Sequence, residues 1–163
     1  MPDTPDQTRV ESIFIRHRNT LMVRANFTDI FTDHYLHLAD HKLKYPSDLD
    51  HKLKELYVGI TLHAVARPWA ETHAWTVTLR APRVNFFVTA SSTHANLVGR
   101  VFTEDVREPP QNLLYTQVKD NSFEPRRSTV ALETENPFDW IQHLYKQSEQ
   151  RPGKVFELSL IHI

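Results

Sequence analysis

The sequence predicts an α+β domain in which β-sheets pack around a few helices. Apolar and polar residues alternate with a period of two through the middle of the chain, which is typical of half-buried strands. Apolar residues recur every three or four positions in three segments, which is typical of amphipathic helices. The two patterns are segregated along the chain, and this favours an α+β fold over a doubly wound parallel sheet.

The chain has 163 residues, of which 40% are hydrophobic and 10% aromatic, enough for one core without a metal or a disulfide. No repeat and no long linker divides it. We therefore expect a single domain over residues 9–163. Residues 1–8 contain two prolines and two aspartates and are too polar to pack, so we expect a disordered N-terminus there.

The first elements are expected to be a hairpin and a short helix. Apolar and polar residues alternate over 11–15 and 20–27, on either side of the polar residues 16–19, and this predicts two strands joined by a turn. Thr32 is the expected N-cap of a helix that runs to about Leu43, before Pro46.

A long helix is expected from about residue 48 to about residue 66. Ser47 is its expected N-cap, and Pro68 is its expected stop. Apolar residues at spacings of three and four form one stripe along it: Leu49, Leu53, Leu56, Tyr57, Ile60 and Ala64.

Strands are expected to follow. Residues 72–90 alternate with a period of two around a turn at Ala81 and Pro82, which predicts two paired strands. Further strands are expected at 97–103, 113–119 and 128–133. Asn136 as N-cap and Pro137 at the first helical position predict a last helix. Pro152 and Gly153 would end this helix, and residues 154–163 alternate as a final strand.

Composition excludes several classes of function. The 19 basic and 20 acidic residues nearly cancel, so we expect neither a nucleic-acid partner nor an anionic membrane partner. No apolar run is long enough to span a membrane and no secretory signal precedes the domain, so a cytoplasmic location is expected. The absence of cysteine excludes disulfides, thiolate zinc sites and a cysteine nucleophile within these residues.

Histidines provide the best metal candidate. His34, His37 and His41 are spaced to share one helix face, where imidazole nitrogens can converge on zinc. No glutamate lies between His37 and His41 as in a His-Glu-x-x-His site, and a solvated helix face explains the spacing equally well. We therefore expect no metal and no other cofactor. The remaining helical histidines are expected at the surface or at the core boundary: His51, His63 and His143.

No group of residues specifies a reaction. Ser91 and His94 could join an aspartate in a triad, but no Gly-x-Ser-x-Gly elbow is present and serines near turns usually serve turn geometry. Two carboxylate pairs, Asp48 with Asp50 and Glu133 with Glu135, could suggest acid–base chemistry, which needs one buried member with a perturbed pKa. The first pair lies at an expected helix start, where acidic residues complement the helix dipole. We expect no catalytic residue and no enzyme activity.

Two aromatic residues stand outside the expected core. Phe87 shares the parity of Asn85 and Thr89, the more polar face of its strand, and Trp69 follows the stop of the long helix. Exposed aromatic residues can form a binding patch. The alternatives are a strand buried on both faces for Phe87 and a covering loop contact for Trp69.

The sequence resembles the redox-regulated 33-kilodalton heat-shock chaperone family. The segment 144–152, which reads Leu-Tyr-Lys-Gln-Ser-Glu-Gln-Arg-Pro, is similar to the Ser-Glu-Gln-x-Pro helix end of that family. Earlier motifs agree in order and spacing: Val23-Arg24, Tyr45-Pro46, Pro82, Val98-Gly99-Arg100 and Leu132-Glu133. The family's glycine-rich central turn is here residues 80–83, Arg-Ala-Pro-Arg, and Leu144 replaces an aromatic residue.

This resemblance implies an ATP-independent holdase that takes part in the stress response and in protein folding by binding unfolded client proteins, with a tendency to form a homodimer. Trp69 and Phe87 are then the candidate client-binding residues. In the family, a C-terminal zinc module with Cys-x-Cys and Cys-x-x-Cys senses oxidants, and these 163 residues contain none of those cysteines. Two other functions stay open: an interaction or structural module with one specific partner, and a histidine-dependent metalloenzyme.

Overall fold

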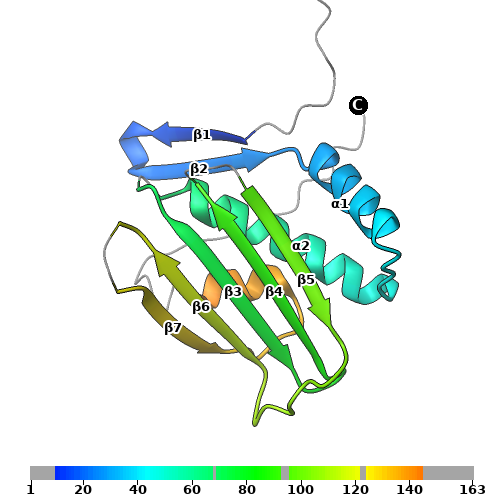
Figure 1. The fold of residues 1–163 in the computed structure, drawn as a ribbon. Coiled ribbons are helices and arrows are strands. Elements are labelled where there is room, and N and C mark those ends of the chain that lie inside the picture. Colours follow the sequence, from blue (N-terminus) through cyan, green and yellow to red (C-terminus); the bar gives the residue numbers. More distant parts are fainter. Residues whose placement is uncertain (1–9, 68, 93–95, 122–123, 145–163) are drawn as a thin grey trace, which may run out of the picture.

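A central antiparallel sheet organises the molecule. The computed structural model describes residues 10–67, 69–92, 96–121 and 124–144. The strand order is β5-β4-β3-β6-β7 (Figure 1). The strands are β3 (Thr72–Leu79), β4 (Val84–Ser91), β5 (Asn96–Phe102), β6 (Leu113–Lys119) and β7 (Arg126–Ala131). The predicted α+β class and these five strands are confirmed. β7 begins two residues earlier than expected and ends at Ala131.

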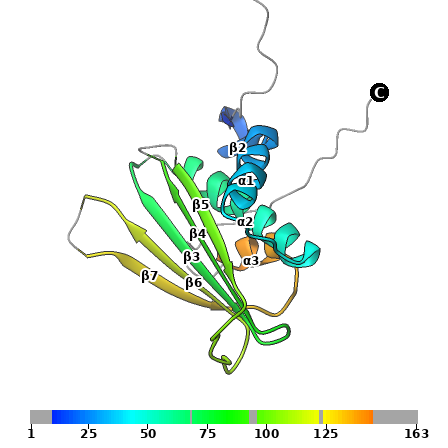
Figure 2. The same ribbon diagram turned by 45° about the vertical axis from the view of Figure 1, so that its right-hand side comes forward.

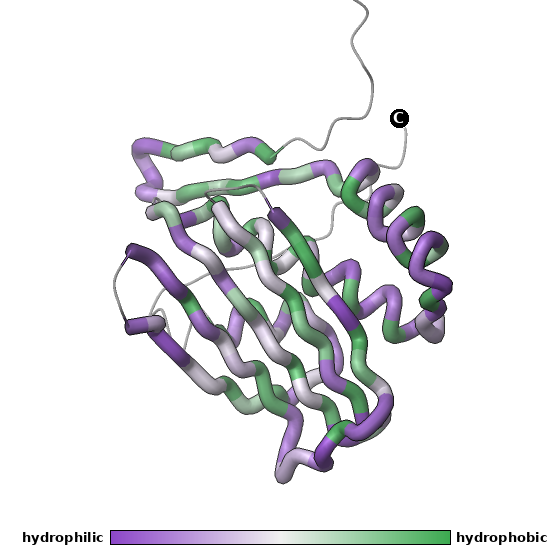
Figure 3. The backbone as a smooth tube through the Cα atoms, in the orientation of Figure 1, coloured by the Kyte–Doolittle hydropathy of each residue, from purple (hydrophilic) through white to green (hydrophobic). Residues whose placement is uncertain are grey.

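Alternate strand residues build the core on one face of this sheet, here called the inner face. The register places Val77 opposite Phe86 and Trp75 opposite Val88, and all four side chains are buried. Two helices, α2 (Ser47–Val65) and α3 (Pro137–Leu144), lie together over this face (Figure 2). The tube in Figure 3 shows the alternation of hydrophobic and hydrophilic residues along the strands.

The apolar stripe of α2 is buried as predicted. Its fully buried members include Leu53, Leu56 and Ile60. Ser47 is the first helical residue and makes no capping hydrogen bond with its side chain, so the predicted N-cap was wrong by one position. Pro46 precedes the helix in an extended conformation, with a ψ of 144°.

The short helix α1 (Thr28–Asp40) begins four residues before the predicted N-cap, so the prediction at Thr32 was wrong. The side-chain oxygen of Asn26 accepts hydrogen bonds from both the backbone N–H and the hydroxyl of Thr28, and this interaction starts the helix. Thr32 lies inside the helix, where its hydroxyl donates to the carbonyl of Thr28. Phe27 stacks on Phe31 and belongs to this junction, not to the preceding strand.

The start of α3 was predicted correctly. The side-chain oxygen of Asn136 accepts a hydrogen bond of 2.9 Å from the backbone N–H of Phe138. The indole N–H of Trp140 donates to the carbonyl of Thr134 at 2.7 Å, which fixes the approach to the helix. The predicted end of this helix, the final strand at 154–163 and the disordered residues 1–8 lie outside the described residues.

The predicted N-terminal hairpin is confirmed as a separate two-stranded sheet. β1 (Val10–Ile15) pairs with β2 (Thr20–Ala25) across a short 3₁₀ turn at Arg16–Arg18. Asn19 closes the turn with a φ of 45°. β2 ends two residues before the predicted end, and it lies against α2 (Figure 1).

Candidate interaction surface

The outer face of the five-stranded sheet, opposite α2 and α3, is the candidate interaction surface. None of the described helices lies on this face (Figure 2). Many residues on this face have short side chains, mainly threonine, alanine and asparagine. The larger apolar residues on the same face are exposed: Phe87 (37%), Val98 (60%), Phe102 (41%) and Tyr115 (36%).

The strand register places Phe87 in a row that crosses the sheet. Phe87 lies opposite Arg100 on β5 and Thr76 on β3, and Thr76 lies opposite Tyr115 on β6. The guanidinium of Arg100 is centred 5.0 Å from the ring of Phe102, within the range of a cation–π interaction. The result is a broad surface of aromatic rings and cationic side chains.

Of the four exposed apolar residues on this surface, the sequence analysis predicted only Phe87. The parity argument identified Phe87 as an outward residue, and the structure agrees. The same argument places Val98 and Phe102 on one face of their strand. However, it does not tell which face of β5 joins the face of Phe87. That assignment depends on the pairing of Val88 with Gly99, which brings residues 11 positions apart together.

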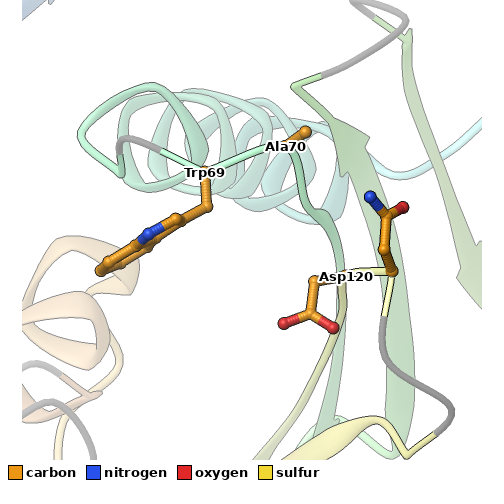
Figure 4. Close-up of a pocket in the computed structure, with 4 residues that line it drawn as sticks. Trp69, Ala70 and Asp120 are labelled. Carbon is orange, nitrogen blue, oxygen red and sulfur yellow. The ribbon is translucent and has the colours of Figure 1, made fainter.

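Trp69, the other candidate, is 49% exposed and lies in the loop between α2 and β3. The guanidinium of Arg67 lies 5.0 Å from the centre of its ring. Trp69 lines a shallow open hollow with Ala70, Asp120 and Asn121 (Figure 4). Trp69 is therefore exposed but is not part of the row that contains Phe87.

The three histidines of α1 do not converge. His34 is buried, and its Nε2 lies 3.0 Å from a carboxylate oxygen of Asp50. The rings of His37 and His41 instead lie 4.1 Å apart, centre to centre. Nowhere in the described ranges do three or more His, Asp or Glu side chains form a group that could hold a metal ion.

His34 belongs to a hydrogen-bonded chain that joins three elements. Its Nδ1 lies 3.5 Å from the hydroxyl of Tyr57, and that hydroxyl donates to the carbonyl of Gly99 at 3.2 Å. Burial raises the pKa of Tyr57, so its hydroxyl stays protonated near neutral pH. The hydroxyl of Tyr35 donates to the second carboxylate oxygen of Asp50. The chain therefore links α1, α2 and β5, and its geometry is that of a structural connection.

The other members of the acidic pairs are exposed. Asp48, Glu133 and Glu135 all lie at the surface, next to the first turns of α2 and α3 or just before them. An acid that works in general acid–base catalysis needs an environment that shifts its pKa. Of the two residues that were considered for a triad and not favoured, Ser91 is half-buried at the end of β4, and His94 lies outside the described residues.

A buried ionic cluster, which the sequence analysis missed, centres on Glu71. Glu71 is 2% exposed and accepts hydrogen bonds from Arg67 and Arg126, while the Nε2 of His73 lies 3.3 Å from its carboxylate. Burial alone would raise the pKa of Glu71, but the hydrogen bond and charge of Arg67, with His73 and Arg126, lower it overall. Arg126 lies 55 residues from Glu71 in the sequence, so no local sequence pattern indicated this cluster.

His63 lies next to this cluster in the core, so its predicted position at the surface or boundary was wrong. It is 2% exposed, and its ring packs 4.9 Å from that of His73 and 5.6 Å from that of Trp75. Burial, helped by His73 and Arg67, lowers the pKa of His63 to about 3. His63 is therefore neutral at pH 7 and contributes mainly to packing.

The hairpin carries a second set of exposed apolar residues, on both of its faces. Phe14 pairs with Leu21 on one face, and Ile13 pairs with Met22 on the other. Their exposed fractions range from 38% to 57%. A two-stranded sheet is marginally stable alone, and exposed apolar residues on both faces are unusual for a surface hairpin.

Comparison with known proteins supports the fold. No protein-family model matches the chain, and no curated protein sequence matches it significantly. Among solved structures, it is similar to the crystal structure of a 33 kDa chaperonin, a heat shock protein 33 homologue, from Thermotoga maritima. The TM-score is 0.50 and the sequence identity 17%, over 60% of this chain and 38% of that one. The chain thus spans well under half of that protein and shares its fold. None of the helices in the described ranges is long and apolar enough to cross a membrane.

Proposed function

We propose that this protein is an ATP-independent holdase-type chaperone domain that binds unfolded proteins on the outer face of its five-stranded sheet. The observation that carries the proposal is the uncovered row of Phe87 and Tyr115, with Val98 and Phe102 beside it. The likeness in fold to a 33 kDa chaperonin supports it. A cytoplasmic location and the absence of enzyme activity belong to the same proposal.

The surface suits weak binding of many sequences. Aromatic side chains bury a large apolar area for little conformational entropy, and short threonine side chains between them leave room for a client chain. No pocket is needed to select one side chain. Binding of this kind requires no ATP and no cofactor, and without cysteine these residues cannot gate it by thiol oxidation.

The proposal is tested by light scattering from a heat-unfolded client protein. We expect the chain to suppress aggregation at a severalfold molar excess, equally with and without oxidant. Replacing both Phe87 and Tyr115 by serine should remove most of the suppression. Leu36→Ser is the matched control, because Leu36 is 59% exposed but lies on α1. Absence of suppression by the unmodified chain under either redox condition would contradict the proposal.

The hairpin favours a second candidate function, an interaction module with one specific partner. Its apolar residues on both faces, and the open edge of β1, suit a second copy of this chain, so we propose homodimerisation through the hairpin.

Sedimentation equilibrium should then show a dimer that Phe14→Asp weakens at least tenfold, while Phe87→Ser leaves it unchanged. A monomer at high micromolar concentration would rule out the dimer. Saturable binding to one protein, without suppression of aggregation, would favour the interaction module.

A further inference from the structure

Charge is distributed unevenly between the sheet and the rest of the molecule. The chain contains 20 acidic residues, yet the strands β3 to β7 contain no Asp and no Glu. Indeed, no acidic residue occurs between Glu71 and Glu104. In contrast, α1 contains three aspartates and no Lys or Arg. A net charge near zero therefore conceals a sheet that is locally cationic.

Three cations of the sheet belong to its outer face. The strand register places Arg100 on β5, Lys119 on β6 and Arg127 on β7 on the same face as Phe87 and Tyr115. A fourth, Arg126, belongs to the inner face, where it pairs with the carboxylate of Glu71 that Arg67 also contacts. Among the described residues, no carboxylate forms an ion pair with any of the three outward cations.

The cations flank the aromatic row. Arg100 lies on one edge strand of the sheet and Arg127 on the other, with Phe87 and Tyr115 on strands between them. Arg127 is held near Gln117 by a hydrogen bond of 3.5 Å, and Arg100 is held over the ring of Phe102. Apolar contact is therefore available at the centre of the face, and positive charge is available on both sides.

From this arrangement we infer that the outer face selects extended polypeptide segments in which acidic side chains adjoin aromatic or aliphatic ones. The inference rests on the proposed function and names its preferred client chemistry. Apolar side chains of the segment pack on the aromatic row, and its carboxylates pair with the flanking guanidinium groups. The complementarity is local, because the acidic helix α1 repels the same segment elsewhere on the molecule.

Single-stranded nucleic acid also binds sheets that combine aromatic and basic residues. Its affinity depends on many phosphate contacts, and the net charge of −1 gives the whole molecule little long-range attraction for a polyanion. Three outward cations suffice for a peptide that has one or two carboxylates beside each aromatic residue. The observations therefore favour an acidic polypeptide segment.

Fluorescence anisotropy with labelled unstructured peptides tests the inference. One peptide combines Phe and Leu with Glu, and matched peptides replace each Glu by Gln or by Lys. Two exposed ion pairs at 0.2–1 kcal/mol each correspond to an affinity about fivefold tighter for the Glu peptide than for the Gln peptide. The Lys peptide should bind more weakly still. The preference should shrink toward equality at about 0.5 M salt, because the charges are exposed.

Variants and competitors separate the possible failures. The triple variant Arg100→Gln, Lys119→Gln and Arg127→Gln removes all three outward cations and should bind Glu and Gln peptides equally, with unchanged thermal unfolding. Equal binding of both peptides by the unmodified chain would overturn the inference and leave the proposed function standing. Binding of none of the three would overturn both. Displacement of the Glu peptide by oligothymidylate at lower concentration than by unlabelled peptide would overturn the inference in favour of a nucleic-acid site.

Discussion

The inner and outer faces of the five-stranded sheet alternate residue by residue along the same strands. On the inner face, Phe86 and Val77 are fully buried beneath α2, and even the carboxylate of Glu71 is enclosed by partners. On the outer face, Phe87 and Tyr115 are more than one-third exposed, and three cations lack carboxylate partners among the described residues. One face accounts for the stability of the fold, and the other is available for binding.

Phe86 and Phe87 show this division most clearly, because they are identical side chains at adjacent positions. Phe86 is 0% exposed and Phe87 is 37% exposed. An aromatic residue on an uncovered face contributes less to the core, while it offers apolar area to another molecule. We therefore expect the side chain of Phe87 to contribute less to the stability of the fold than that of Phe86.

The largest expected effect is on the free energy of unfolding, when alanine substitutions at these two positions are compared. Phe86→Ala should lower the free energy of unfolding by about 3–5 kcal/mol, because it leaves a cavity beneath α2. Phe87→Ala should lower it by less than about 1.5 kcal/mol. Urea unfolding followed by the fluorescence of the buried Trp75 and Trp140 measures both. Equal losses would mean that the outer face is covered in solution.

A substitution in the ionic cluster around Glu71 should lower the free energy of unfolding nearly as much. Glu71→Ala removes the buried carboxylate that accepts a hydrogen bond from Arg67, whose side chain is 6% exposed. Removing one partner of a buried ion pair costs about 3 kcal/mol or more, and the same urea titration measures it. Glu108→Ala is the control, because Glu108 pairs with Arg80 at the surface. A loss no larger than that of the control would show that water enters the cluster.

Acid should weaken the inner face through His63. Its pKa is about 3 in the folded chain against 6.5 as its ordinary value, so the unfolded chain binds the extra proton first. Stability is complete above pH 6.5 and falls by about 1.4 kcal/mol per pH unit from pH 6.5 toward pH 3. Urea unfolding at pH 6, 5 and 4.5 should show a shallower fall in His63→Leu. If the free energy of unfolding falls equally with pH in the unmodified chain and in His63→Leu, His63 is not a buried, neutral histidine.

The smallest expected effect is that of the outer cations on stability. Arg100→Gln and Arg127→Gln should each change the free energy of unfolding by less than about 0.5 kcal/mol, because exposed charges contribute little. Thermal unfolding at low and high salt measures this. A loss above about 1.5 kcal/mol would place these residues in the fold and not in a binding surface.

Local patterns predicted most of the fold, and long-range pairing accounts for what they missed. The apolar stripe of α2 and the Asn136 cap are signals within a few residues, and both were identified. The start of α1 was misplaced because alternation up to Phe27 extended the predicted strand over the helix junction. In the candidate site, Phe87 was found from its parity.

The remainder of the outer face depends on which strands become neighbours. Tyr115 joins Phe87 only because β6 pairs with β3 across a connection that includes two other strands. His63 and Glu71 are polar residues that a sequence pattern assigns to the surface, and only their distant partners allow burial. The acid-free stretch between Glu71 and Glu104 was the one local signal of a cationic sheet.

The central claim, that clients bind on the outer face, can be tested directly because the chain contains no cysteine. Single cysteines are introduced as Val98→Cys and Thr129→Cys on the outer face and as His51→Cys at an exposed position of α2. Their rates of alkylation are measured with and without a saturating unfolded client. We predict slower alkylation at positions 98 and 129 and an unchanged rate at position 51. Protection at position 51 alone, or at none of the three while client remains bound, would contradict the account.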